Sequence, residues 1–416
     1  MSAAASPIPG QPHCAAAYAA QLLRSLGATP IHALSAPAEH PAVAWATCGL
    51  MQLTGEPGGA PTMCPAPLTA CADGALAALA SLAPAGALAG LRGSSILAER
   101  AAIMRLHRAG ARSPGGACRL YPARDGWIAL NLAREDDWAL LPAWLELEQP
   151  MVPAQLPELI AGRAADELVE RGRLLGLAVA ADAMPESGPG WFSVLARGVP
   201  VPAPRKAPRV LELSSLWAGP LCGRLLLALG ADVVKLESPQ RPDGARHGHP
   251  AFFDRLNGGK RCVALDPQQP AGRERFRALI AAADIVIEGS RPRALRQLGI
   301  DAEAMVRERP GLTWLSLTGY GRGEPQENWI AYGDDAAVAA GLSGLLHAVT
   351  GQRLIVGDAI ADPLTGLHAA LAAWASHREG GGRLVGLALR DVVAHCIGFD
   401  LPAGPSERRQ RQAEWT

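Results

Sequence analysis

The sequence has few aromatic residues and no net charge. Phe and Tyr number five and four among 416 residues, and aromatic side chains make up 5% of the chain. Lys plus Arg and Asp plus Glu both number 39, so the net charge provides no long-range attraction toward nucleic acid or an anionic membrane. Neither is expected as a partner, and any anionic ligand must be bound by local groups.

Two further patterns are missing. The eight cysteines never form a C-x-x-C pair, which argues against a zinc site or a redox dithiol, and no metal is expected. Gly, Pro or a charge interrupts every apolar stretch before it could span a bilayer, and the first residues lack the form of a signal peptide. We therefore expect a cytoplasmic protein.

From about Arg209 onward, short β-branched runs alternate with amphipathic helical stretches, which is typical of parallel βαβ units. Val210 to Ser215 predicts the first buried strand, and Gly219 to Leu229 predicts the helix after it. Further strands are expected at Cys262 to Asp266 and Leu312 to Gly321. The pattern predicts an α/β fold with a Rossmann-like open parallel sheet. No G-x-G-x-x-G follows the first strand, so neither a nicotinamide nor a flavin cofactor is expected.

The other segments predict a second, smaller domain and irregular connections. Residues 1–40 are expected to form a leader, and residues 41–183 a helical region followed by a small α+β domain centred on a strand pair. A Pro-rich linker over residues 184–208 leads into the Rossmann-like domain of residues 209–400. Residues 401–416 are polar and are expected to be disordered.

One internal repeat is visible in the sequence. Gly49 to Ser81 matches Gly344 to Ser376, and in that register Ala70 occupies the place of Asp362. One copy therefore carries a carboxylate where the other carries a methyl group, which suggests a working copy and a lapsed one. Ala-rich helices also resemble one another by chance, so chance stays an alternative.

Asp362 is the strongest candidate for chemistry. It precedes Pro363 and a long helical run, the pattern of an N-cap aspartate with proline at the first helical position. Backbone N–H groups and the helix dipole hold such a carboxylate ionised, so it could attack a thioester carbonyl. Most aspartates in this setting only cap a helix, and the same structural interpretation applies to Asp358.

Three positions could bind an anionic ligand. The turn at Trp217 and Ala218 opens a helix directly after the first strand, so its N–H groups could hold a phosphate or a thioester oxygen. Lys260 and Arg261 precede the third strand, where they could bind the phosphates of a nucleotide-like ligand. Arg291 begins an arginine-rich helical stretch. An ordinary turn, a solvated basic pair and an exposed charged face are the alternatives.

Five ordered blocks between Val210 and Leu389 resemble the class III CoA-transferases, the CaiB/BaiF family. The blocks are VLELSSLWAGPLCGRLLLALGADVVKLE, LNGGKRCVALD, DIVIEGSRPRALRQLGI, LTWLSLTGYGRGEP and GDAIADPLTGLHAAL. Compared residue by residue, the last block places the family's catalytic aspartate at Asp362. The copy at Ala70 lacks it.

The resemblance implies transfer of CoA between an acyl-CoA thioester and a carboxylic acid acceptor, with coenzyme A as co-substrate, no permanently bound cofactor and a homodimer. Asp362 would attack the acyl-CoA to give a mixed anhydride, and CoA would then form an aspartyl-CoA thioester that an acceptor carboxylate takes over. The family's contacts with CoA fall on Trp217, Ala218, Leu265, Asp266, Pro267, Gln268 and Ser290.

The sequence departs from the family pattern in three ways. Ser238 and Gln297 stand where the family has basic residues. The part from Ala44 to about Ala180 resembles the family's aspartate helix and small domain but comes first, so the domain order looks permuted, or fused and trimmed. Two alternatives therefore stay open. One is an α-methylacyl-CoA racemase or related isomerase, although Ala331 to Gly341 lacks the histidine of the family's G-H-D setting. The other is a lapsed homologue that binds CoA or serves as a partner subunit.

Overall fold

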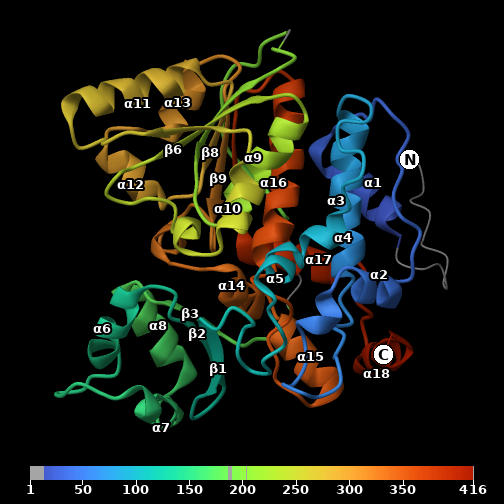
Figure 1. The fold of residues 1–416 in the computed structure, drawn as a ribbon, viewed down its shortest axis with the longest axis vertical. Helices are drawn as coiled ribbons and strands as arrows, with labels where there is room; N and C mark the ends of the chain where they lie inside the picture. Colours follow the sequence, from blue (N-terminus) through green and yellow to red (C-terminus); the bar gives the residue numbers. More distant parts are fainter. Residues whose placement is uncertain (1–13, 186–189, 203, 416) are drawn as a thin grey trace.

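A seven-stranded, mostly parallel sheet forms the centre of the larger domain (Figure 1). The computed structural model of the protein describes residues 14–185, 190–202 and 204–415. The strand order is β4-β10-β9-β8-β5-β6-β7, and β4 alone runs antiparallel to its neighbour. The strands are β4 Ser193–Arg197, β5 Arg209–Leu213, β6 Asp232–Glu237, β7 Arg261–Ala264, β8 Ile285–Glu288, β9 Thr313–Thr318 and β10 Arg383–Ala388. The expected open parallel sheet is confirmed.

Helices cover both faces of this sheet, which explains why its central strands are buried on both sides. One face packs against α11 Pro270–Ala282, α12 Pro292–Gln297 and α13 Ala302–Glu308. The other packs against α9 Ala218–Ala228, α10 Pro250–Asn257 and α16 Ala361–Arg378. Figure 1 shows α16 and α9 side by side on that face.

A further helical layer encloses α16. It consists of α1 Ala15–Leu26, α3 Leu68–Leu82 and α17 Leu389–Gly398. Because α16 is covered on all sides, nearly all of its residues are buried. Within the described ranges, no helix is both long and apolar enough to cross a bilayer.

The expected leader is wrong from Cys14 onward, because α1 belongs to the core. Tyr18 and Leu22 are fully buried between α1 and its neighbours. Gly27 ends this helix in the left-handed conformation that favours glycine. An Ala- and Leu-rich run was mistaken for a leader because its packing partner, α3, lies far along the chain. Residues 1–13 lie outside the described residues.

The smaller domain contains an antiparallel sheet of order β1-β2-β3. The predicted strand pair is confirmed as β1 and β2, which are paired up to Pro122 and Trp127. The third strand was not predicted. This domain comprises β1 Cys118–Pro122, β2 Trp127–Asn131, α6 Glu135–Trp144, α7 Leu156–Ala161, α8 Ala165–Leu175 and β3 Ala178–Ala181. It contacts the larger domain through β2, β3 and α14 Gly333–Ala339.

Short elements complete the fold. The helices are α2 Pro41–Thr47, α4 Gly93–Ile96, α5 Glu99–Met104, α15 Leu342–Thr350 and α18 Pro405–Trp415. The 3-10 turns are η1 Leu50–Gln52, η2 Pro153–Gln155, η3 Gly244–His247 and η4 Gln326–Asn328.

The internal repeat has a counterpart in three dimensions. The helices of its two copies, α3 and α16, lie side by side (Figure 1). A Cβ at Gly74 of α3 would lie 2.5 Å from the carbonyl oxygen of Ala15, and a Cβ at the equivalent Gly366 of α16 would lie 2.8 Å from that of Ala218. Thus α1 approaches α3 at Gly74, and α9 approaches α16 at Gly366, which is the equivalent position of the repeat. Two helix pairs, rather than one Ala-rich stretch, are therefore repeated, which argues against chance.

The expected disordered tail is wrong. Residues 405–415 form α18, whose Trp415 is 5% exposed. The Arg408 Nε atom donates a 2.7 Å hydrogen bond to the carbonyl oxygen of Pro402. Composition predicted disorder because the segment is polar, but Trp415 belongs to the main hydrophobic core and contacts the ring of His40.

The expected linker is partly structured. β4 lies within residues 184–208 and pairs with β10 at the sheet edge. Trp191, just before it, is 1% exposed. Proline content alone predicted a linker, whereas the open sheet edge provides partners for a short strand. Residues 186–189 and 203 lie outside the described residues.

Gly74→Val should lower the free energy of unfolding by about 2–3 kcal/mol, because the added side chain overpacks the contact between α1 and α3. Urea unfolding measures this change. Gly398→Ala is the control, since a Cβ there meets no atom within 4 Å, and stability should change by less than about 1 kcal/mol. Wild-type stability in Gly74→Val would contradict the docking of α1 on α3.

Candidate active site

Asp362 lies in the first turn of α16 but does not cap this helix. The helix begins at Ala361, and the Asp362 N–H donates to the carbonyl oxygen of Ala359 at 2.9 Å. The expected N-cap role is therefore wrong, since the helix starts before Asp362. The carboxyl instead faces the backbone N–H groups of Ala218, at the start of α9, and Gly333, at the start of α14.

The groups around Asp362 shift its pKa in opposite directions. Burial raises its pKa to about 7, and the nearby carboxyl of Asp334 adds to that rise. The Arg100 guanidinium and the N–H groups of Ala218 and Gly333 pull the pKa of Asp362 down. A carboxyl with these neighbours titrates near neutral pH, which is a mark of functional sites.

Glycine at position 333 allows this close approach. A Cβ there would lie 2.3 Å from Oδ2 of Asp362 and 2.3 Å from the carbonyl oxygen of Ala359. Ala359 itself has a φ of 45°, and Leu216, on the opposite wall, has a φ of 69°. Both are non-glycine residues in the left-handed region, which concentrates backbone strain next to Asp362.

Two more carboxyls belong to the same cluster. Asp334 and Asp335 lie in the first turn of α14, and burial raises their pKa values to about 6 and about 7. Asp335 Oδ1 accepts hydrogen bonds from Asn131 Nδ2 at 3.0 Å and from the Tyr332 N–H at 2.9 Å. Asn131 therefore connects the smaller domain directly to this cluster.

The cation of the cluster comes from the N-terminal half of the chain. Arg100 of α5 donates from Nε and Nη2 to the two carboxylate oxygens of Asp358, at 2.7 and 2.5 Å. The Asp358 side chain is fully buried. The guanidinium also lies over the Trp217 ring, with Cζ 5.6 Å from the ring centroid. This paired geometry fixes the arginine beside Asp362.

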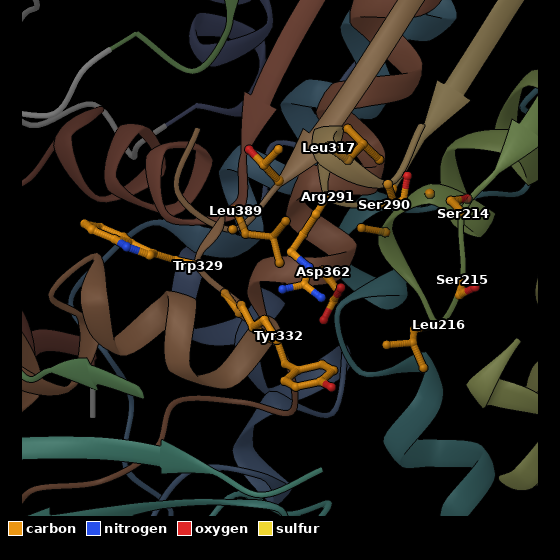
Figure 2. A pocket seen from close by; sticks show the side chains of 18 of the residues that line it. Ser214, Ser215, Leu216, Ser290, Arg291, Leu317, Trp329, Tyr332, Asp362 and Leu389 are labelled. Carbon is orange, nitrogen blue, oxygen red and sulfur yellow. The ribbon is translucent and has the colours of Figure 1, made fainter. Parts of the chain in front are cut away.

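Two cavities meet at Asp362. The first, which we call the arginine cavity, has a volume of about 340 Å³. Its walls include Arg134, Ser214, Arg241, Ser290, Arg291, Tyr332, Asp362 and Leu389. Figure 2 shows the Arg291 side chain extending toward Asp362, with Tyr332 and Leu389 beside the same space.

The second, which we call the Trp217 cavity, has a volume of about 200 Å³. Its walls include Arg100, Met104, Ala117, Asn131, Trp217, Ala245, Phe252, Tyr332, Asp334 and Asp362. Leu216, Tyr332 and Asp362 belong to both cavities. A ligand in each cavity would therefore reach the same carboxyl.

The arginine cavity contains polar groups without a protein partner. The hydroxyl oxygens of Ser214 and Ser290 are buried and have no hydrogen-bond partner among the described residues. Since buried polar groups are normally hydrogen-bonded, these two hydroxyls favour a polar ligand here. No group of three or more His, Cys, Asp or Glu side chains within the described ranges could hold a metal ion.

The model of CoA-transferase family III matches residues 207–414, half of the chain. The chain belongs to CoA-transferase family III. The match contains Asp362 and both strained turns, but it excludes Arg100.

Two curated family members illustrate the relationship. The succinate--glutarate CoA-transferase of Agrobacterium fabrum is 32% identical over 201 residues, which cover 44% of this chain and 50% of the relative. The formyl-CoA:oxalate CoA-transferase of Rhodopseudomonas palustris is 34% identical over 196 residues, with coverages of 44% and 46%. The chain thus spans about half the length of the curated relatives it matches.

Proteins with solved structures are also similar in sequence. A CAIB/BAIF family protein from Brucella suis is 31% identical, with a TM-score of 0.42 and coverages of 47% of this chain and 56% of that one. A hypothetical protein from Mycobacterium tuberculosis is 30% identical, with a TM-score of 0.42 and coverages of 46% and 57%.

The structure brings some of the predicted family contacts together. Ala218, Ser290 and Arg291 line the arginine cavity with Asp362, and Trp217 lines the other cavity. Residues 265–268 follow β7 at the same carboxyl edge of the sheet, but they line neither cavity. There, Asp266 accepts hydrogen bonds from the Gln268 N–H and from Gln240 Nε2.

Lys260 and Arg261 are placed differently from the expectation. The Lys260 Nζ atom is buried, 2.7 Å from Glu212 Oε2 and 2.8 Å from the Pro220 carbonyl oxygen. Glu212 also pairs with the buried Lys235 at 3.0 Å. Arg261 is exposed and pairs with Asp232 at 2.7 Å. Lys260 therefore joins β5 to α9 and does not contact the cavities.

Sequence reasoning missed several residues of the site. Arg100, Arg134 and Arg241 drew no attention because nothing in their local sequence distinguishes them from surface arginines. The adjacent carboxylates of Asp334 and Asp335, which the structure places in the first turn of α14, were the one local signal available.

Lys260→Met should lower the free energy of unfolding by about 2–4 kcal/mol, because it leaves one oxygen of the buried Glu212 without its partner. Urea unfolding measures the loss, and Lys206→Met is an exposed control that should change little. CoA affinity of the folded variant, measured by calorimetry, should stay within about twofold of wild type. A Lys260→Met variant that is stable but has lost CoA affinity would restore the phosphate-binding role.

Proposed function

We propose that the protein transfers CoA between an acyl-CoA thioester and a carboxylic acid, with Asp362 as the nucleophile. The observation that carries this proposal is the position of the Asp362 carboxyl, at the junction of two cavities and beside two backbone N–H groups. The names of the curated relatives support it. Because the chain spans about half the length of those relatives, their activity is proposed for this chain on the basis of its own site.

In the first half of the reaction, an oxygen of Asp362 attacks the carbonyl carbon of the acyl-CoA. The carbon–sulfur bond breaks, CoA leaves as the thiolate, and a mixed anhydride forms. The thiolate then attacks the side-chain carbonyl carbon of Asp362, and the donor acid departs as a carboxylate. This leaves CoA bound to Asp362 as a thioester.

In the second half, the acceptor carboxylate attacks the same Asp362 carbon and releases the thiolate, which then attacks the acyl carbon of the acceptor. The Asp362 carboxylate is regenerated, and the steps balance without a net proton. Each attack on Asp362 places negative charge on its carbonyl oxygen. The N–H groups of Ala218 and Gly333 already face that carboxyl, so they are suited to stabilise the charge.

CoA is proposed to occupy the arginine cavity. Guanidinium groups match phosphates, and Arg241 and Arg291 have no acidic partner among the described residues. Burial is the main cause of the lowered pKa of Arg291, and the charges of Arg293, Arg134 and Arg241 lower it further. These cations therefore lie close together. Ser238 stands where the family has a basic residue, and Arg241 forms an isolated backbone β-bridge with it. Arg241 is proposed to take over the role of the family's basic residue.

Neither alternative from the sequence is preferred. An isomerase needs a second proton-transfer group, and the relatives found are named transferases rather than racemases. A lapsed homologue would have no use for the groups placed around Asp362. These include Arg100, which is paired with Asp358, and Gly333, where a Cβ would collide with Asp362. The homodimer and the cytoplasmic location stay predictions.

Incubation with acyl-CoAs should convert Asp362 to an anhydride or a CoA thioester. Hydroxylamine should displace the acid or CoA and leave an aspartyl hydroxamate at position 362, and peptide mass spectrometry detects this label. Asp362→Asn should abolish the label and reduce turnover at least about 1000-fold, since the nucleophile is removed. Asp254→Asn, which changes an exposed aspartate on α10, is the matched control and should keep both. Turnover that survives in Asp362→Asn would contradict the proposal.

The rate of Asp362 labelling should rise with pH through about 7, because the carboxyl attacks only when it is deprotonated. Arg100→Gln removes the cation that lowers the pKa of Asp362, so the profile should shift to higher pH. Single-turnover labelling across pH 5–9 measures both.

If Arg100→Gln folds poorly, the pH dependence of labelling can be measured in the double variant Arg100→Gln with Asp358→Asn. Neither partner of the ion pair is then left as an uncompensated charge. Arg100→Lys should restore part of the profile. An unchanged profile in all folded variants would show that Arg100 is only structural.

A further inference from the structure

The Trp217 cavity differs from the arginine cavity in the chemistry of its walls. Trp217 and Phe252 meet edge to face, with ring centroids 5.2 Å apart, and Met104 and two alanines complete an apolar wall. These apolar residues line the same cavity as Asp362, whereas Arg134, Arg241 and Arg291 line the other cavity. The two cavities thus offer a charged and an apolar binding surface to one carboxyl.

Electrostatics disfavours an anionic group in the Trp217 cavity. Among the described lining residues the one arginine is Arg100, whose Nε and Nη2 atoms donate to Asp358, so that the carboxylate of Asp358 balances its charge. Asp334 and Asp362 line the same cavity and add negative charge when ionised. His249, at the rim, already accepts the Ala251 N–H through Nδ1. A substrate carboxylate placed here would find no free cation among the described residues.

The size of the cavity limits its occupant. An apolar cavity of about 150 Å³ accommodates a benzene molecule, so the roughly 200 Å³ of the Trp217 cavity suits a group of about six to eight carbon atoms. Smaller acyl groups would also fit. A long unbranched chain would extend beyond the walls.

We propose that the Trp217 cavity binds the acyl group and selects an uncharged, apolar acyl chain of up to about eight carbon atoms over a dicarboxylic one. This inference rests on the proposed CoA-transferase function. With CoA in the arginine cavity and the acyl group in the Trp217 cavity, the thioester carbon lies between them, next to Asp362.

The N-terminal half supplies much of this specificity. Arg100, Met104, Ala117 and Asn131 all precede the part of the chain that matches the family model. Part of the wall proposed to choose the acyl group is therefore outside the region matched by the family model, whereas Trp217 and Phe252 lie inside it. Specificity can differ from theirs while the CoA cavity and Asp362 are kept.

The test compares butyryl-CoA with succinyl-CoA, which differ in the terminal carboxylate. Single-turnover labelling of Asp362 by each thioester measures the choice without knowledge of the acceptor. Butyryl-CoA and benzoyl-CoA should label at least about tenfold faster than succinyl-CoA, because burial of an unpaired carboxylate is unfavourable. Lauroyl-CoA should label more slowly than hexanoyl-CoA.

A gained cation should reverse the preference. Ala133 is an exposed residue on the wall of the Trp217 cavity, so Ala133→Arg should fold and offer a guanidinium to a terminal carboxylate. The ratio of succinyl to butyryl labelling should rise at least about tenfold. Val152→Arg adds the same charge at an exposed site of the smaller domain, lines neither cavity, and should leave the ratio unchanged.

The outcomes separate this inference from the proposed function. Labelling by succinyl-CoA as fast as by butyryl-CoA, in a protein that labels at Asp362, would overturn the acyl specificity and leave the transferase proposal intact. Failure of every acyl-CoA, acetyl-CoA included, to label Asp362 would overturn both. Equal ratios in wild type and Ala133→Arg would place the acyl group outside the Trp217 cavity.

Discussion

The site depends on a single ionic constraint, the paired hydrogen bonds between Arg100 and the buried Asp358. A carboxyl as enclosed as Asp362 would stay protonated without a nearby cation, and free arginine side chains rarely hold one position. Asp358 fixes the guanidinium beside Asp362, while Trp217 supports its flat face. A contact between the two halves of the chain therefore helps to lower the pKa of Asp362, the proposed nucleophile.

The degenerate repeat copy has a packing role. Its helix α3 carries Ala70 where α16 carries Asp362, yet α3 packs against α16, and α1 packs against α3 as α9 packs against α16. The N-terminal half also carries Arg100 and Asn131 to the carboxyl cluster. The N-terminal half therefore contributes packing through the repeat copy and, outside that copy, two residues of the carboxyl cluster.

The strained backbone on both sides of Asp362 is consistent with this assignment. Leu216 and Ala359 adopt the left-handed conformation without being glycine, which costs about 1–3 kcal/mol at each position. The buried carboxyls of Asp334 and Asp335 also oppose folding when ionised. Packing of α16 on nearly all sides offsets these terms, so the strain is concentrated where chemistry is proposed.

The sequence by itself determined the open parallel sheet and the β1–β2 pair, because each depends on local periodicity or a turn. A short ordered motif also made Asp362 the candidate nucleophile. The tertiary structure alone decided the role of Arg100, which meets Asp358 258 positions away, and the burial of Lys260, which local sequence presented as a solvated cation. It also decided that α1 and α18 are ordered, because their partners lie far along the chain. Local sequence predicts helices, strands and the side chains that they carry. Packing between distant segments decides which of the charged side chains are paired and which cavities remain.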